Sequence, residues 1–245
     1  LGVEQVFSTT LAPRVTGYAD IKHMSKWGFR NVFGVDWANA GSGYHLQYGN
    51  FEDSNNHWIK KEPTFSYDYS HRIGRTPYSY GLKYEVGRWY NNGITSTHTY
   101  YNFTLSRDSI MLGRNFRLNL STGYSITKES HDKSTVRGFS YDATMIKDFD
   151  VRWAAFLGYH YSTTNSQNSL FNYNVDDYSR KLEAGFSYRM DDRDRFVVGI
   201  NYDTTGRTLK DVDYYWYRDI HCAELILRYR AKRHNWHVSV QFTPW

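Results

Sequence analysis

The sequence has little of what defines several other classes of protein. Its 245 residues include one cysteine, Cys222, which excludes an internal disulfide framework and a cysteine-based zinc site. No run approaches the ~18 consecutive apolar residues of a membrane-spanning helix, and the mean hydropathy is −0.71. No window keeps an apolar repeat of period 3.6, so amphipathic helices are not indicated. The net charge of +5 is spread along the chain without a basic cluster, which does not indicate nucleic-acid binding.

The chain is rich in aromatic residues, and its apolar and polar residues alternate with a period of two. It contains 23 Tyr, 14 Phe and 8 Trp, and aromatic side chains favour strands. In residues 195–203 one face carries Phe196, Val198, Ile200 and Tyr202, whereas Val197, Gly199 and Asn201 lie on the other. The same period of two recurs at 27–37, 77–90, 151–162 and 178–190. The pattern predicts an all-β protein.

The alternating stretches divide the chain into about fourteen strands without a domain boundary, so residues 1–245 are expected to form one domain. The expected strands span 12–22, 27–37, 43–50, 62–71, 77–90, 95–106, 115–127, 135–146, 151–162, 178–190, 195–203, 208–217, 221–230 and 235–243. Residues 2–8 have the character of the end of another strand. The chain opens on Leu1 without a leader-like segment, and we expect a mature chain or a fragment.

The residues opposite each apolar face distinguish a membrane barrel from a soluble β-sandwich, which also alternates. Here the apolar faces often end in Tyr or Trp, as aromatic girdles at a membrane interface do, and the opposite faces mix Gly, Ser, Arg and Glu, as a wet lumen does. We therefore predict a transmembrane antiparallel up-and-down β-barrel in the bacterial outer membrane, complete or part of a larger barrel. A soluble all-β domain is the alternative.

The lengths of the connections predict the orientation. With the C-terminus in the periplasm, the inner connections are 38–43, 72–77, 107–114, 147–150, 191–194 and 218–219, and the outer ones include 51–61, 129–135 and 163–177. The three longest polar loops all fall on the outer side, as expected of outer-membrane barrels.

No catalytic motif stands out. The chain lacks G-x-S-x-G, a Walker loop and H-E-x-x-H, and the pairs His131–Asp132 and Asp176–Asp177 fit solvated loop charge. His221 and Cys222 are neighbours on a predicted strand, so their side chains should point to opposite faces and form no Cys–His pair. We expect a protein without enzymatic activity, metal or cofactor.

Charged residues predicted on the lumenal face are candidates for lining a polar conduit; mutual ion pairing that holds the barrel shape is the alternative. These lumen-lining candidates are Lys83, Glu85, Arg152, Arg189, Glu224, Arg228 and Arg230. On the strand after Cys222, Ala223, Leu225, Leu227 and Tyr229 are predicted to face lipid. The same register turns Cys222 inward at the periplasmic end.

Residues 215–242, YWYRDIHCAELILRYRAKRHNWHVSVQF, resemble the C-terminal strands of the LptD family of lipopolysaccharide-assembly barrels. Asp219, Ile220, His221 and Cys222 match the family's acidic-hydrophobic-His-Cys turn, whereas Ala223 replaces the usual aromatic residue. The resemblance implies a large barrel that delivers lipopolysaccharide to the outer leaflet, with a periplasmic N-terminal domain, a plug lipoprotein and a periplasmic transport bridge. It also implies a disulfide from Cys222 to that N-terminal domain, and lateral exit of acyl chains between the first and last strands.

The last predicted strand carries a stripe that fits an outer-membrane insertion signal: Trp236, Val238, Val240 and Phe242. Pro244 breaks the strand before Trp245, so the in-phase aromatic is Phe242. Two other functions stay open. One is a complete fourteen-stranded passive porin for small solutes with a mild preference for anions, and the other is a barrel enzyme or an adhesin.

Overall fold

The structure is a computed structural model that describes residues 2–24, 28–52, 58–163, 170–171 and 179–242. Fifteen strands occupy these ranges, each joined to the next by a connection. They are β1 (Gly2–Ala12), β2 (Val15–Met24), β3 (Gly28–Asn39), β4 (Ser42–Glu52), β5 (Trp58–Arg72), β6 (Tyr78–Asn91), β7 (Ile94–Gly113), β8 (Phe116–Glu129), β9 (Thr135–Asp148), β10 (Trp153–Ser162), β11 (Arg180–Arg189), β12 (Asp194–Asp203), β13 (Thr208–Asp219), β14 (Ala223–Arg230) and β15 (Asn235–Phe242).

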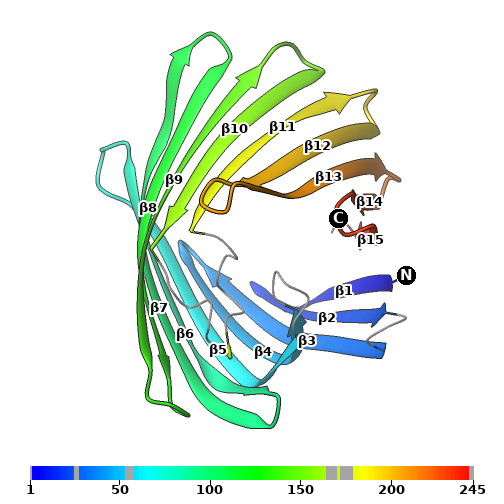
Figure 1. Cartoon of the computed structure of the whole chain (residues 1–245). Coiled ribbons are helices and arrows are strands. Elements are labelled where there is room, and N and C mark those ends of the chain that lie inside the picture. The colour runs from blue at the N-terminus through cyan, green and yellow to red at the C-terminus, as the bar shows by residue number, and fades with distance from the viewer. Residues whose placement is uncertain (1, 25–27, 53–57, 164–169, 172–178, 243–245) are drawn as a thin grey trace.

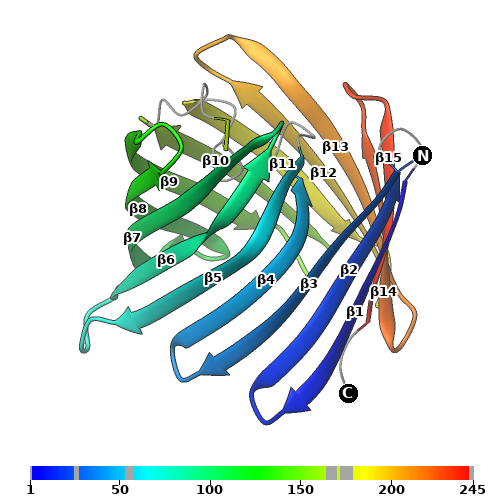
Figure 2. The same cartoon turned by 90° about the horizontal axis from the view of Figure 1, so that it is seen from below.

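The strands form one sheet in sequence order, and every neighbouring pair is antiparallel. The sheet curls until its two edge strands, β1 and β15, face each other. Figures 1 and 2 show these strands next to the two ends of the chain. Their Cα atoms approach within 8 Å, but among the described residues they form no hydrogen-bonded ladder. We call this line of contact the β1/β15 seam. Because fifteen is odd, β1 and β15 run in the same direction, so a ladder closing the seam would be a parallel one.

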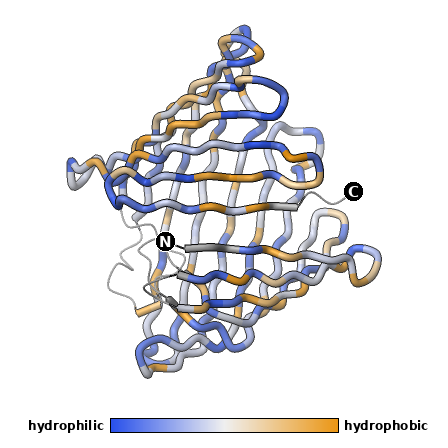
Figure 3. The backbone as a smooth tube through the Cα atoms, turned by 90° about the vertical axis from the view of Figure 1, so that its right-hand side faces the viewer, coloured by the Kyte–Doolittle hydropathy of each residue, from blue (hydrophilic) through white to orange (hydrophobic). Residues whose placement is uncertain are grey.

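Rows of outward-facing side chains that are largely apolar alternate with rows of inward-facing side chains that are largely polar. Leu157 pairs with Ala184, which pairs with Ile200, and both Leu157 and Ile200 are exposed on the outside. One residue along, Gly158, Glu183 and Asn201 form an inward row. Figure 3 shows apolar and polar positions following one another along the strands around the seam. An apolar outer surface of this extent requires hydrocarbon around it, and the fold is a transmembrane up-and-down β-barrel.

Aromatic pairs lie near both ends of the outer surface. Trp37 stacks on Tyr44 across the β3–β4 turn with ring centroids 4.8 Å apart, and Trp153 lies 4.2 Å from Tyr188 at the same end of the barrel. At the other end, the Tyr229 and Trp236 rings are 4.5 Å apart beside the β14–β15 connection. These pairs occupy the positions of the predicted interfacial girdles.

The connections alternate between the two ends of the barrel along the chain. One end of the barrel, here the turn end, carries connections 13–14, 40–41, 73–77, 114–115, 149–152, 190–193 and 220–222. The opposite end, the loop end, carries 25–27, 53–57, 92–93, 130–134, 163–179, 204–207 and 231–234. The longest connection, 163–179, lies at the loop end as predicted, but 73–77 at the turn end is as long as 53–57 and 130–134 at the loop end. Among the described residues, no helix is long and apolar enough to cross a membrane.

Aspartates set several of the short connections. The Asp191 carboxylate accepts hydrogen bonds from the backbone N–H groups of Arg193 and Asp194, at 2.8 and 2.7 Å, and these bonds hold its pKa below the ordinary value. Asp150 and Asp219 accept from the backbone N–H groups two residues further on in the same way. Such side-chain bonds offer the backbone a turn instead of a continued ladder.

Three predicted boundaries were wrong. Residues 2–8 belong to β1, which continues to Ala12, so the structure describes fifteen strands and not fourteen. The predicted loop 51–61 is strand at both ends, because β4 reaches Glu52 and β5 starts at Trp58. The predicted turn 107–114 is mostly strand, since β7 continues to Gly113 through two shifts of register against β8.

Candidate functional site

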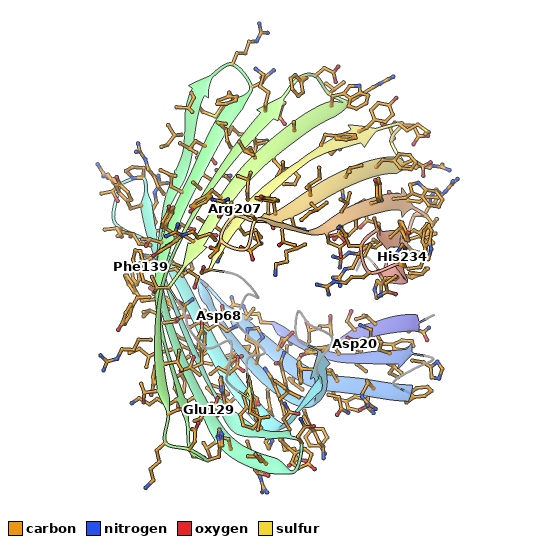
Figure 4. The ribbon with its side chains drawn as sticks, viewed as in Figure 1. Asp20, Asp68, Glu129, Phe139, Arg207 and His234 are labelled. Carbon is orange, nitrogen blue, oxygen red and sulfur yellow. The ribbon has the colours of Figure 1, made fainter. Side chains whose placement is uncertain are left out.

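The inward faces of the strands form the lumenal wall, which is the candidate functional site. Figure 4 shows Asp20, Asp68 and Glu129 on the concave side of the ribbon and Phe139 on the convex side. Two groups of side chains on this wall are the most densely connected. The Trp89 cluster lies at the loop end on β5–β8 and the β10–β11 connection, and it consists of Ile59, Lys61, Glu85, Trp89, His98, Glu129 and Phe171. The Asp213 cluster lies on β13, β14 and the connection after it and consists of Asp211, Asp213, Arg228, Arg230 and Arg233.

An ion pair and an indole form the centre of the Trp89 cluster. The Lys61 Nζ donates to Glu85 Oε1 at 2.8 Å, and both side chains are almost fully buried. The same ammonium lies 4.4 Å from the centroid of the Trp89 ring. The His98 ring stacks on Trp89 at 3.6 Å with an interplanar angle of 11°. The indole therefore lies between a cation and an imidazole.

A bulge in β5 brings Lys61 to this position. The register against β6 shifts between Lys61 and Thr64, where Pro63 cannot donate a ladder hydrogen bond. Gly87 lies opposite, and a Cβ there would come within 2.7 Å of the Thr64 Cα, so only glycine permits this approach. The Trp89 indole N–H then donates to the Thr64 hydroxyl at 3.0 Å.

A carboxylate orients His98. Glu129 accepts from His98 Nδ1 at 2.5 Å and from the Ser96 hydroxyl at 2.7 Å. Buried His98 Nε2 has no hydrogen-bond partner among the described residues. A Ser–His catalytic pair requires the hydroxyl to bond the imidazole. Because the Ser96 hydroxyl bonds the carboxylate instead, these three residues do not assemble that pair.

Part of the long β10–β11 connection packs onto this cluster. The Phe171 side chain is buried and meets the Trp89 ring edge-on, with centroids 6.3 Å apart. The Asn91 side-chain amide donates to the Leu170 carbonyl at 2.8 Å. His131, on the β8–β9 connection, packs edge-on against Phe171 at 5.4 Å as well as pairing with Asp132 at 3.6 Å. The described part of the connection therefore covers the wall at the loop end, whereas the predicted pair Asp176–Asp177 lies outside the described residues.

One carboxylate joins two guanidinium groups in the Asp213 cluster. Arg228 Nε and Nη2 each donate to Asp213 at 3.1 Å, in the two-pronged geometry that suits arginine and carboxylate. Arg230 Nε lies 3.6 Å from the same carboxylate. Arg233 pairs separately with Asp211, with its Nε 3.3 Å from the carboxylate oxygen.

Two further histidines of the lumenal wall are paired with carboxylates. His45 Nδ1 lies 2.7 Å from Asp36 and its Nε2 lies 2.6 Å from Asp68, and His160 Nδ1 lies 2.5 Å from Asp142. Within the described ranges, no group of three or more His, Cys, Asp or Glu side chains could hold a metal ion.

The predicted lumen-lining residues fall into two groups. Glu85, Lys83, Glu224, Arg228 and Arg230 lie on inward positions of β6 and β14. Glu85 contacts Lys61 and lies 4.0 Å from Lys83, as the ion-pairing alternative predicts. The prediction for Arg152 was wrong, because this residue lies in the β9–β10 turn and not on a strand. Arg189 is an exposed residue at the turn end of β11.

The placement of Cys222 also differs from the prediction. Asp219 is the last residue of β13, and the turn Ile220–Cys222 follows it, with His221 in the left-handed region at φ 76°. The backbone N–H of His221 donates to Asp219, and Cys222 is exposed. Because β14 begins only at Ala223, strand alternation does not turn the thiol inward.

The hairpin of β14 and β15 mostly follows the predicted register. Leu225 pairs with Val240, Leu227 with Val238 and Tyr229 with Trp236, and Trp236 and Val238 are exposed on the outer surface. Ala223 was predicted to face lipid but is buried, with 2% of its surface exposed. The backbone of Phe242 pairs with Ala223, while its side chain lies outside the described part.

Most of the Trp89 cluster and both aspartates of the Asp213 cluster were not predicted from the sequence. Lys61 was assigned to a loop, and Trp89, His98 and Glu129 were not chosen. Asp213 had a usable signal, because it lies two residues after Asp211 on a predicted strand that forms a hairpin with the Arg228 strand.

No family model and no curated protein matches the chain. Among solved structures, it is similar to the crystal structure of the siderophore receptor PirA from Pseudomonas aeruginosa. The TM-score is 0.43 and the sequence identity is 9%, over 97% of this chain and 56% of the receptor. The chain thus spans little more than half the length of that receptor.

Proposed function

We propose that the chain is a bacterial outer-membrane barrel, or part of one, that takes part in assembling lipopolysaccharide and delivering it to the outer leaflet. The observation that carries the proposal is the β1/β15 seam, where two neighbouring strands lack a ladder among the described residues. The turn Asp219–Cys222, with the alternating hairpin after it, supports the proposal through its resemblance to the LptD family.

The geometry suits a lipid with a large polar head. A head group is costly to place in hydrocarbon, so it needs a polar path, and the lumenal wall offers charged and hydroxyl side chains. Acyl chains need hydrocarbon, which lies outside the barrel. A seam without a ladder can connect the two environments without breaking the hydrogen bonds that hold the other strand pairs together.

The resemblance also brings partners into the proposal. A plug lipoprotein would occupy the lumen from the turn end, and a periplasmic bridge would supply lipopolysaccharide there. The exposed turn that carries Cys222 lies at the same end.

Depletion of the protein tests this function directly. We expect depleted cells to bind less of a labelled lectin that is added from outside and recognises lipopolysaccharide. Outer-membrane porins should stay folded in the same cells. The probe reports outer-leaflet lipopolysaccharide and not total synthesis. Unchanged surface labelling after full depletion would reject the proposal.

A passive porin is the second candidate, favoured by the inward polar rows that continue around the described sheet. Planar-bilayer recordings distinguish the two. A porin gives steady open conductance with a mild anion preference, whereas an assembly barrel with its plug bound gives none.

The exposed position of Cys222 gives a further prediction. In the full-length protein we expect Cys222 to be oxidised to a cysteine of the N-terminal domain, so that Cys222→Ser changes mobility on non-reducing gels and not on reducing gels. His221→Ala is the matched control, because it alters the same turn and keeps the thiol. Equal mobility of Cys222→Ser and wild type without reductant would count against the family resemblance.

A further inference from the structure

The lumenal wall beside the seam carries more positive than negative charge at one place. Arg228 and Arg230 share a single carboxylate, Asp213, on the strand pair next to β15. Arg228 takes both oxygens of Asp213 at hydrogen-bond distance, whereas Arg230 reaches it only at 3.6 Å. The pair of arginines therefore keeps about one uncompensated positive charge on the wall.

The surroundings hold the two arginines in place. The guanidinium carbon of Arg228 lies 5.1 Å from the centroid of the Tyr215 ring, which stacks on Tyr217 at 5.8 Å and 17°. The Asp213 side chain that anchors them is 7% exposed, so water screens it weakly. A guanidinium fixed against a ring and a buried carboxylate loses little conformational freedom on binding an anion.

We infer that Arg228 and Arg230 form a phosphate-binding site that takes the phosphorylated head group of a lipid on its way to the seam. Arginine suits phosphate because its planar fork can donate two parallel hydrogen bonds to phosphate oxygens. The site lies on β14, whose other neighbour is β15, so a bound head group is one strand away from the seam. This inference rests on the proposed function for the direction of travel, but phosphate binding itself does not depend on it.

The test measures binding of a phosphorylated lipid to the purified full-length protein in nanodiscs. The probes are lipid A, the same lipid A after enzymatic removal of its phosphates, and inorganic phosphate. We expect Arg230→Gln to weaken the binding of lipid A about tenfold or more, as the loss of a charge-assisted hydrogen bond does. The dephosphorylated lipid should bind weakly and be insensitive to the substitution.

Arg233→Gln is the matched control, because Arg233 has its own partner, Asp211. It removes the same charge from the same end of the wall and should change the affinity less than threefold, as expected of a charge outside the site. Equal losses in Arg230→Gln and Arg233→Gln would replace the site by a general electrostatic field. Inorganic phosphate that binds as tightly as lipid A would make the ligand a free anion and overturn the lipid assignment.

Folding of each variant is checked by heat-modifiable gel mobility. A second variant, Arg230→Lys, keeps the positive charge but removes the planar guanidinium group. We expect an intermediate affinity for Arg230→Lys, and full wild-type affinity would contradict two-pronged recognition. If the wild-type protein and all variants bind lipid A and dephosphorylated lipid A equally well, the phosphate-binding site is rejected. Intact discrimination together with normal surface lipopolysaccharide after depletion would reject the proposed function and leave the site standing.

Discussion

Glu85→Leu is expected to lower the free energy of unfolding by about 3–5 kcal/mol, because it removes the carboxylate that the buried Lys61 ammonium contacts at 2.8 Å. The ammonium would keep its contacts with the Trp89 and Phe51 rings, with centroids 4.4 and 4.6 Å away. Those contacts are worth about 2 kcal/mol at most when desolvated and do not replace an ion pair. Denaturant titration of the protein in lipid vesicles, followed by tryptophan fluorescence, measures the change.

The double variant Lys61→Met/Glu85→Leu should recover most of the loss. Replacing a buried pair by apolar side chains of similar size is often neutral or stabilising. A double variant as unstable as Glu85→Leu would mean that Glu85 acts through another contact, with Lys83 at 4.0 Å as the nearest charge.

The exposed ion pair Arg72–Asp108 at the turn end is the control for burial. Its side chains are 55% and 48% exposed, so Arg72→Gln should change stability by less than about 1 kcal/mol. A loss as large as that of Glu85→Leu would show that burial does not set the cost of breaking an ion pair in this barrel.

The alternation of residue types was enough to predict the sheet and its two faces. Phe196, Val198 and Ile200 lie on the outer face as expected, since a period of two leaves only the choice of which face meets lipid. The end that carries the longest connection, 163–179, followed from the strand count along the chain. Both features depend on local sequence, which is why they could be predicted.

The clusters on the lumenal wall depend on register, which alternation does not determine. Lys61 lies beside Glu85 where the bulge at Pro63 shifts β5 against β6, and the polar composition of residues 51–61 predicted a loop there instead. His98 meets Glu129 because β7 and β8 pair at that step of the ladder, far along the chain from their turn. A slip of one residue would separate either pair and send the side chains to opposite faces.

Turn length explains the difference for Cys222. Placing the strand start two residues too early made the thiol part of the alternating pattern, whereas the positive φ of His221 ends that pattern before Ala223. The charges of Arg228 and Arg230 were predicted on the correct face because they lie further along the strand, where the register is already fixed.

Closing the β1/β15 seam with a disulfide is expected to reduce lipopolysaccharide delivery by roughly tenfold or more while leaving the barrel folded, if acyl chains leave there as proposed. Cysteines at Val6 or Ser8 on β1 are combined with cysteines at His237 or Ser239 on β15, since these positions face inward. A disulfide needs Cα atoms within about 7 Å, and the two strands approach within 8 Å. Delivery is measured as surface lipopolysaccharide, with and without reductant.

Two controls distinguish the effect of closing the seam from the effect of introducing cysteines or a disulfide elsewhere. Each single cysteine reports any reaction with Cys222, and the pair Ile226→Cys/Ser239→Cys links β14 to β15, which already share a ladder. That second link should form without changing delivery, because it constrains strands that stay together in any case. Normal delivery with a fully oxidised β1/β15 link would place the lipid exit elsewhere. Recovery by reductant of the β1/β15 variants alone would identify the separation of these two parallel-running strands as the step that releases the lipid.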